Sequence, residues 1–377
     1  MKRFPHLLIL ASVILSCGGN EPVNPGSETI PPVPTPTFAK GADISWVSEM
    51  EKDGKAFKKK DGATADIFDV LKEVGINSIR LRVWVNPYNG WSGKDDVVKL
   101  ATRAAKAGMA LMVDFHYSDF FADPGKQIIP AAWAADKADV TKMAKHVSDH
   151  TTEVLTALKN SGVSPAWIQI GNETRGGMLY GTGDLDYKDE GNEFKSFLKL
   201  YNAGYDAAKS VFPSALVMPH IDNAFDFGNN EWWFSSFKAQ GGKYDMIALS
   251  HYPQACWNGK TQIPWSTANS QAINSIKALS SIMGVPVIVS EIGVKTNADE
   301  ATATRVLSEF MAEAKKIDNC KGVFYWEPEV YGEWKPAIYS LPDQIEKYAG
   351  ERTTWGGYDM GAFLSDGRAS SVMDAFK

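Results

Sequence analysis

From residue 40 onward, short apolar runs alternate with longer stretches in which apolar side chains recur every three or four residues. The longer stretches predict helices with one buried face. One such face runs from Ile67 to Val74 and stops at Gly75, before an apolar run over 76–83. A glycine in the left-handed conformation ends a helix at low cost and turns the chain back toward a sheet. The same order of helix, glycine and strand recurs at three later glycines: Gly108, Gly162 and Gly284.

Eight apolar runs have the length and the flanking turn residues of buried parallel strands. Because helices separate them and no linker interrupts them, they predict α/β architecture in the form of a single closed (β/α)8 barrel (TIM barrel). Three connections, 120–133, 174–191 and 326–360, are long for a compact domain, and long loops after strands usually build binding sites. The predicted strands are Gly41–Ser45, Ser78–Val83, Met109–Phe115, Ala166–Ile170, Ala215–His220, Met246–Ser250, Pro286–Ser290 and Gly322–Trp326.

Composition is ordinary for a globular protein, with 44% hydrophobic and 22% charged residues among 377. A net charge of -6 argues against a nucleic-acid partner, and no glycine-rich phosphate loop of the usual form is present. The 12 tryptophans are more informative, because indole faces suit carbohydrate rings as well as they suit a core. Five of them could serve either purpose: Trp133, Trp232, Trp233, Trp257 and Trp334.

The N-terminus has the pattern of an export signal. Met1-Lys2-Arg3 is basic, 7–15 is apolar but too short to cross a bilayer, and Ser16-Cys17 ends the segment. This arrangement resembles a bacterial lipobox, in which Cys17 would be lipidated and become the first residue of the mature chain. We therefore expect an exported protein that is lipid-anchored at the bacterial cell envelope, in the outer membrane and facing the periplasm or the surface. A plain secretory signal with an incidental cysteine is the alternative.

The predicted domain organisation follows from that signal. We expect residues 1–17 to form a lipoprotein signal peptide, proline-rich residues 18–37 an extended linker, and 38–377 the barrel domain. Only Cys256 and Cys320 remain after the lipobox, and their spacing leaves open whether they form a disulfide. No group of cysteines and histidines has the spacing of a zinc site.

Two glutamates stand just beyond predicted strands, Glu173 after the fourth and Glu291 after the seventh. Active sites of parallel barrels lie at the carboxyl ends of the strands. A single strand-end glutamate could be a salt-bridge partner, but polar and aromatic residues at several strand ends together indicate a site. The others are Asp43, Arg82, Trp84, Asp114, His116, Tyr117, Asn172, His251, Tyr252, Trp326 and Glu327.

Carboxylates on strands four and seven face each other across the mouth of a barrel, as glycoside hydrolysis requires. In a retaining mechanism one carboxylate attacks the anomeric carbon, while the other, about 5 to 5.5 Å away, protonates the leaving oxygen; inversion needs a wider gap. Asn172 would bond the sugar 2-hydroxyl, and Trp326 would lie under the sugar ring. Arg82 and His116 would keep Glu291 ionised.

Several motifs resemble the endo-β-1,4-galactanases of glycoside hydrolase family 53, a family of retaining (β/α)8 enzymes in clan A. The resemblance spans residue 40 to the C-terminus and is most specific in the loop after the third predicted strand. It rests on Gly41-Ala42-Asp43-Ile44-Ser45, Leu81-Arg82-Val83-Trp84-Val85-Asn86-Pro87, Asp114-Phe115-His116-Tyr117-Ser118-Asp119, Ala122-Asp123-Pro124-Gly125-Lys126-Gln127, Gln169-Ile170-Gly171-Asn172-Glu173, Ser290-Glu291 and Tyr325-Trp326-Glu327-Pro328.

By this resemblance Glu173 is the acid/base and Glu291 the nucleophile, and the substrate is the β-1,4-galactan of pectin side chains or type I arabinogalactan. His251 stands where a second aromatic residue is expected, and 292–294 and the loop 327–354 differ from the family pattern. The resemblance and the strand-end positions together nominate substrate-binding residues: Asp43, Arg82, Trp84, Asp114, His116, Asn172, His251, Tyr252 and Trp326.

No cofactor is expected for this chemistry. Some bacterial relatives bind structural calcium between late loops, and Asp299, Glu300, Asp343 and Asp366 are available here, without recognised ligand spacing. We expect a monomer. Two other functions stay open: another retaining clan A β-glycanase acting on mannan, xylan or glucan, and a surface lipoprotein that binds glycan without cleaving it.

Overall fold

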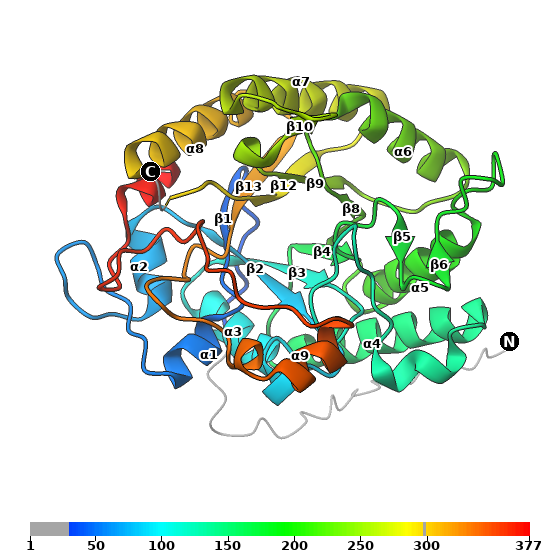
Figure 1. Ribbon diagram of the computed structural model, residues 1–377, viewed down its shortest axis with the longest axis horizontal. Helices are drawn as coiled ribbons and strands as arrows, with labels where there is room; N and C mark the ends of the chain where they lie inside the picture. Colours follow the sequence, from blue (N-terminus) through cyan, green and yellow to red (C-terminus); the bar gives the residue numbers. More distant parts are fainter. Residues whose placement is uncertain (1–29, 297–298) are drawn as a thin grey trace, which may run out of the picture.

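The computed structural model describes residues 30–296 and 299–377 (Figure 1). The predicted signal peptide, the lipobox Cys17 and most of the predicted linker lie outside these residues. Within the described ranges, no helix is long and apolar enough to cross a membrane.

Parallel strands form a barrel at the centre of the molecule, and helices surround it (Figure 1). The sheet runs in the order β7-β4-β3-β2-β1-β13-β12-β9-β8, so the barrel prediction is confirmed. Its strands are β1 (Ala39–Asp43), β2 (Ser78–Val83), β3 (Ala110–Phe115), β4 (Trp167–Ile170), β7 (Leu216–Met218), β8 (His220–Ile221), β9 (Ile247–His251), β12 (Val287–Ile292) and β13 (Cys320–Trp326).

The fifth predicted strand, Ala215–His220, is not continuous. It is divided at Pro219 into β7, which pairs with β4, and β8, which pairs with β9. Proline has no N–H to donate to a neighbouring strand, so the ladder is interrupted there. The carbonyl of Pro219 still accepts a hydrogen bond from the N–H of Ala248 at 3.0 Å. The barrel is therefore completed through this divided strand.

The four helices predicted before Gly75, Gly108, Gly162 and Gly284 are present, and each of these glycines follows its helix in the left-handed region, with φ between 71° and 97°. Two short hairpins, β5 (Gly177–Met178) with β6 (Gly183–Asp184) and β10 (Trp257–Asn258) with β11 (Thr261–Gln262), lie in the loops. The α-helices are α1 (Val47–Lys52), α2 (Ile67–Glu73), α3 (Lys94–Lys106), α4 (Val140–Asn160), α5 (Lys195–Val211), α6 (Phe227–Ala239), α7 (Trp265–Met283), α8 (Glu300–Ala314) and α9 (Pro342–Ala349). Short 3-10 helices cover Tyr88–Gly90, Ala131–Asp136, Pro253–Ala255, Ala337–Ser340 and Ser371–Phe376.

The interior of the barrel changes from apolar to charged along its axis. Near the amino ends of the strands, a small cluster that includes Met112, Trp167 and Phe324 fills the barrel, and Val33 packs against it from the preceding segment. Nearer the carboxyl ends, Arg80 and Asp114 are fully buried. The apolar end stabilises the barrel by burial, and the charged end leads into the mouth.

Cys256 and Cys320 are free, buried thiols. Cys320 begins β13, whereas Cys256 lies in the loop after the carboxyl end of β9. Since the strands are parallel, the two cysteines lie toward opposite ends of the barrel, too far apart for a disulfide.

Candidate active site

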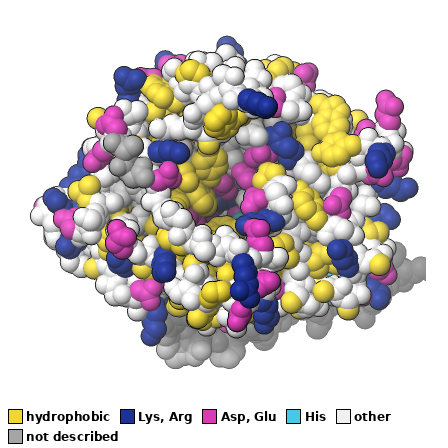
Figure 2. All heavy atoms as spheres, viewed as in Figure 1, with side chains coloured by type: hydrophobic (Ala, Val, Ile, Leu, Met, Phe, Trp, Pro, Cys, Tyr) yellow, Lys and Arg dark blue, Asp and Glu magenta, His cyan; other side chains and the backbone are white. Residues whose placement is uncertain are grey.

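Glu173 and Glu291 line one cavity of about 380 Å³ at the mouth of the barrel. Figure 2 shows this mouth as a hollow at the centre of the face, with hydrophobic and acidic side chains inside it. Glu291 belongs to β12, and Glu173 follows β4 in a left-handed conformation with φ 47°, which is strained for a residue other than glycine. Aromatic side chains form much of the wall: Phe121, Tyr252, Trp326, Tyr339, Trp355 and Tyr358.

A buried arginine that the sequence analysis did not nominate, Arg80, organises the floor of the cavity. Its guanidinium lies 2.7 Å from Asp43, 2.8 Å from Asp114 and 2.7 Å from an oxygen of Glu291. Arg80 lies two positions before Arg82 on β2, so both side chains point to the same face of the strand. That spacing was the signal in the sequence for a second inward cation.

Arg82 does not contact Glu291 as predicted. It pairs with Glu327 at 2.5 Å, and its guanidinium lies 4.2 Å from the ring of Trp46 and 4.8 Å from that of Trp84. Arg80 occupies the place beside Glu291, which leaves Arg82 to neutralise a different buried carboxylate. Arg82 therefore holds the aromatic wall and Glu327 in position.

His116 also influences Glu291 only through another residue. Its Nε2 lies 2.9 Å from Asp114, and its Nδ1 accepts the N–H of Ala122 at 3.0 Å. Asp114 in turn contacts Arg80, so His116 orients the network under Glu291 rather than the carboxylate itself. The contact of His116 predicted with Glu291 is thus replaced by one with Asp114.

Asn172 and Tyr252 do lie beside the two glutamates, as predicted. The Asn172 amide accepts from Arg80 at 2.9 Å and donates to the carbonyl of Ala122 at 2.8 Å, which fixes its orientation before substrate binds. Tyr252 donates its hydroxyl hydrogen to Oε2 of Glu291 at 2.8 Å. Trp326 packs edge-on against Tyr252 with 6.1 Å between ring centroids.

The two glutamates have different surroundings, which affect the pKa values of their carboxyl groups differently. Burial and the nearby Glu291 carboxylate raise the pKa of Glu173 well above its usual range. Burial also raises the pKa of Glu291, but the Arg80 guanidinium and the Tyr252 hydroxyl oppose that rise. Between the two, the shared proton therefore resides on Glu173, and Glu291 is the carboxylate.

A second residue that the sequence analysis missed, His220, lies under Glu173. Its Nδ1 lies 3.2 Å from the backbone N of Glu173, and its Nε2 lies 2.8 Å from Oγ of Ser250. Burial and the Arg80 charge lower the pKa of His220 well below its usual value, so the ring is neutral. The sequence places His220 only at the end of the fifth predicted strand; in the structure it begins β8, directly after Pro219.

Five nominated residues do not line the cavity: Asp43, Arg82 and Asp114 lie in the buried ion-pair network beneath it, and the other two are Trp84 and His251. Trp84 is buried behind its wall, where its ring contacts Phe120 and Phe121. His251 directs its ring to the helices, with Nε2 2.9 Å from Asn269 and its centroid 4.8 Å from that of Phe310. Because neighbouring side chains on a strand point to opposite faces, the inward Ser250 places His251 outside the barrel.

The five tryptophans whose role the sequence leaves open fall into a buried group and an exposed group. Trp133, Trp233 and Trp334 are buried, whereas Trp232 and Trp257 are 39% and 54% exposed. Trp232 stacks on Tyr187 with 5.9 Å between ring centroids. Hydrophobic side chains gather over α6 on the face shown in Figure 2.

The calcium candidates do not come together. Asp299 caps α8, Glu300 bonds Ser371, Asp343 pairs with Arg352, and Asp366 pairs with Arg368. Across 30–296 and 299–377, no group of three or more His, Cys, Asp or Glu side chains is arranged to hold a metal ion.

Two carboxylic groups of unequal proton affinity, set among aromatic rings in a cavity at the mouth of a (β/α)8 barrel, define the site of a glycoside hydrolase. The comparisons agree with that class. The model of glycosyl hydrolase family 53 matches residues 39–376, and the chain belongs to this family.

Individual relatives support the same family. The endo-beta-1,4-galactanase of Bacillus subtilis (strain 168) is 31% identical over 356 residues, covering 86% of this chain and 75% of its own. A structure described under two fungal beta-1,4-galactanases superposes with a TM-score of 0.72 at 26% identity, covering 90% of this chain and 98% of the other. The Ignisphaera aggregans GH53 catalytic domain shares the fold, with a TM-score of 0.74 at 24% identity over 93% of this chain and 98% of its own.

Proposed function

We propose that the protein is a retaining endo-β-1,4-galactanase that hydrolyses β-1,4-galactosidic bonds in galactan or type I arabinogalactan. The single observation that carries this proposal is the pair of Glu173 and Glu291 in one cavity of a chain of family 53. Galactan is favoured over mannan, xylan or glucan because named relatives in the family are galactanases. A binding protein without activity would have no use for two carboxyl groups with opposed protonation.

In this mechanism a carboxylate oxygen of Glu291 attacks the anomeric carbon and forms a glycosyl ester. Arg80 and Tyr252 hold the two oxygens of Glu291 and fix the direction of attack. Glu173 gives its proton to the glycosidic oxygen as that bond breaks. The resulting Glu173 carboxylate then takes a proton from the water that hydrolyses the ester, which restores both groups.

Reducing-sugar release from purified β-1,4-galactan, mannan, xylan and glucan tests the substrate. We expect galactan to be cleaved to oligosaccharides of several lengths from the start, as internal cleavage requires. Hydrolysis of mannan, xylan or glucan without hydrolysis of galactan would contradict the assignment. Absence of hydrolysis of all four, with galactan still bound, would favour a binding protein.

We also propose that the protein is a monomer, exported and anchored to the outer membrane through a lipid on Cys17. The support is the basic, apolar and Ser16-Cys17 pattern of the N-terminus, followed by a proline-rich tether. In a bacterial host, Cys17→Ala should move the protein from the membrane fraction to the soluble fraction while galactan hydrolysis per molecule stays the same. Retention of the variant in the membrane would contradict the anchor. Light scattering after size exclusion tests the monomer.

A further inference from the structure

Ser250, on β9, lies between the two glutamates. Its side chain is fully buried, and its Oγ lies 3.4 Å from Oε2 of Glu291. The same hydroxyl forms a hydrogen bond with the carboxyl group of Glu173 and so opposes the rise in the pKa of that group. A hydroxyl has one hydrogen to donate and rotates about its C–O bond. Ser250 can therefore donate to only one of the two glutamates at a time.

His220 leaves the hydrogen of Ser250 available for a glutamate. Nδ1 of His220 accepts the backbone N–H of Glu173 at 3.2 Å, and a backbone amide can only donate. Nε2 of Gln169, a second donor, lies 2.8 Å from the same Nδ1. Since the ring is neutral, its single hydrogen lies on Nε2. The ring therefore donates to Oγ of Ser250 at 2.8 Å, and the hydroxyl hydrogen of Ser250 is directed elsewhere.

The side-chain oxygen of Asn172 does not require the opposite arrangement. Oδ1 of Asn172 lies 3.1 Å from Nδ1 of His220. This oxygen already accepts hydrogen bonds from Arg80 at 2.9 Å and from Gln169 at 3.1 Å, which occupy its two lone pairs. A hydrogen on Nε2 of His220 is therefore consistent with the neighbours of both ring nitrogens.

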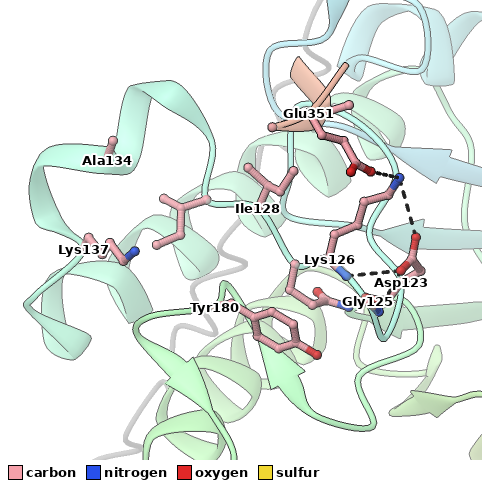
Figure 3. A pocket seen from close by; sticks show the side chains of 12 residues that line it. Asp123, Gly125, Lys126, Ile128, Ala134, Lys137, Tyr180 and Glu351 are labelled. Carbon is pink, nitrogen blue, oxygen red and sulfur yellow. Dashed lines mark hydrogen bonds and ion pairs between the residues drawn. The ribbon is translucent and has the colours of Figure 1, made fainter. Parts of the chain in front are cut away.

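The acidic groups around Glu173 have partners of their own. Asp222, in the loop after β8, pairs with Arg175 at 2.5 Å. Asp123 lines the site and a larger cavity that adjoins it, and it is turned toward Lys126, with 3.9 Å between the charged atoms (Figure 3). Both carboxylates disfavour a negative charge on Glu173, whereas the serine hydroxyl favours one.

Glu291 is held mainly by donors other than Ser250. Arg80 lies 2.7 Å from one of its oxygens, and Tyr252 donates to the other at 2.8 Å. Ser250 adds a longer hydrogen bond to the oxygen that Tyr252 binds, so it can turn away without removing the main partners of Glu291. The acidic neighbours of Glu291, each paired with an arginine, are Asp43, Asp114 and Glu327.

We propose that Ser250 is a positioning residue that moves its hydrogen bond between the two glutamates during the reaction, and that His220 holds it as a donor. In the free enzyme Glu291 is the carboxylate and accepts this hydrogen. Once Glu173 has given its proton to the glycosidic oxygen and Glu291 has become an ester, the negative charge and the hydrogen bond lie on Glu173. Both return when Glu173 takes a proton from the water that cleaves the ester. The inference rests on the proposed function, because the movement follows the charge in that mechanism.

The pH profile of Ser250→Ala tests this movement. A hydrogen bond donated to a carboxylate lowers its pKa, so its loss raises the pKa of both glutamates. Since kcat/KM on galactan requires Glu291 ionised and Glu173 protonated, both limbs of its profile should move to higher pH, each by about 0.5 to 1 pH unit. Ser275→Ala removes a buried hydroxyl on α7 and is the matched control, with an unchanged profile. Movement of one limb alone, or of neither, would overturn the proposal.

An activated substrate isolates the second half of the reaction. The aryl group of 2,4-dinitrophenyl β-1,4-galactobioside leaves without a proton, so hydrolysis of the glycosyl ester limits kcat. That step requires Glu173 ionised. In Ser250→Ala the acidic limb of kcat should therefore move to higher pH, with kcat about three- to tenfold lower on that limb. An unchanged limb in a variant with the wild-type melting temperature would overturn the movement of the hydrogen bond to Glu173.

Two replacements of His220 test its part. The amide nitrogen of glutamine takes the place of Nε2 and still donates to Ser250, whereas asparagine reaches only the place of Nδ1. His220→Asn should therefore show the shifted limbs of Ser250→Ala, and His220→Gln should remain near the wild type. Equal shifts in both variants would overturn the role of His220. Failure of the wild type to cleave galactan would instead overturn the proposed function.

Discussion

At the scale of single residues, the chemistry of the site depends on Arg80, a buried cation shared by three carboxyl groups. Arg80 contacts Asp43, Asp114 and Glu291 at once, and all three carboxyl groups are shielded from water. A buried carboxylate without such a partner would take up a proton. The planar fork of arginine reaches several acceptors in fixed directions, which the ammonium group of lysine cannot do.

Arg80→Lys is therefore expected to impair the nucleophile without removing the charge. Weaker contact with Glu291 lets the pKa of that group rise further. Since the reaction needs Glu291 ionised, the acidic limb of the profile of kcat/KM against pH should move to higher pH, with a loss of about 10²-fold at its optimum. Arg103→Lys, a surface arginine that pairs with Glu51 and Asp66, is the control. An unshifted acidic limb would contradict this role of Arg80.

The two glutamates should respond differently to replacement. Glu291→Ala should abolish measurable hydrolysis, and azide should restore cleavage of an aryl galactoside by forming a glycosyl azide. Glu173→Ala should lower kcat/KM on galactan about 10²- to 10⁴-fold, but much less on an aryl galactoside whose leaving group needs no proton. Equal losses on the two substrates would argue against Glu173 as the acid. Full activity of Glu291→Ala would argue against it as the nucleophile.

At the scale of elements, joints between helices and strands position these residues. Gly284 follows α7 with φ 71° and lies three residues before β12, the strand that carries Glu291. Only glycine adopts this conformation freely, because a Cβ crowds the neighbouring carbonyl. The divided fifth strand has a comparable effect, since Pro219 ends one ladder and His220 begins the next.

Gly284→Ala should lower the free energy of unfolding by roughly 1 to 2 kcal/mol, because no atom lies within 4 Å of the added methyl group and only backbone strain remains. The control is Gly228→Ala in α6, where φ is not positive and the space is also open; it should raise stability by about 0.5 to 1 kcal/mol. Denaturant unfolding measures both. Equal stability of Gly284→Ala and the wild type would show that the joint tolerates a side chain.

At the scale of the whole molecule, the barrel is closed at one end and open at the other. Val33 packs on the apolar cluster at the amino ends of the strands, and Ile30 and Phe38 pack against the larger core. The last part of the predicted linker thus lies against the barrel. The opposite end, at the carboxyl ends of the strands, holds the cavity that Glu173 and Glu291 line.

A chain that begins at residue 38 should be about 1 to 2 kcal/mol less stable than one that begins at residue 30, because it loses the partly buried side chains of Ile30 and Val33. Activity of the folded shorter chain should be unchanged, since the cavities lie at the other end. Unfolding curves of the two chains, with galactan hydrolysis as a second measurement, check this. Equal stability of the two chains would mean that residues 30–37 contribute nothing to the free energy of unfolding.

The sequence alone determined the barrel and the two central residues. Strand and helix periods, with glycines at the joints, are local properties, so eight strands and their order could be predicted from neighbouring residues. Parallel strands bring their carboxyl ends to one rim, which was enough to bring Glu173 and Glu291 to the same end. The family resemblance, carried by contiguous motifs such as 122–127, was also local, and the comparisons confirmed it.

Only the tertiary structure decided which side chains meet. The choice of Arg80 over Arg82 beside Glu291, the neutral His220 beneath Glu173 and the outward turn of His251 depend on register and on which face of a strand points inward. Lys126 meets Glu351 across more than two hundred residues of sequence. Such contacts join elements distant along the chain, so no local pattern records them, and they set the positions of the protons in the site.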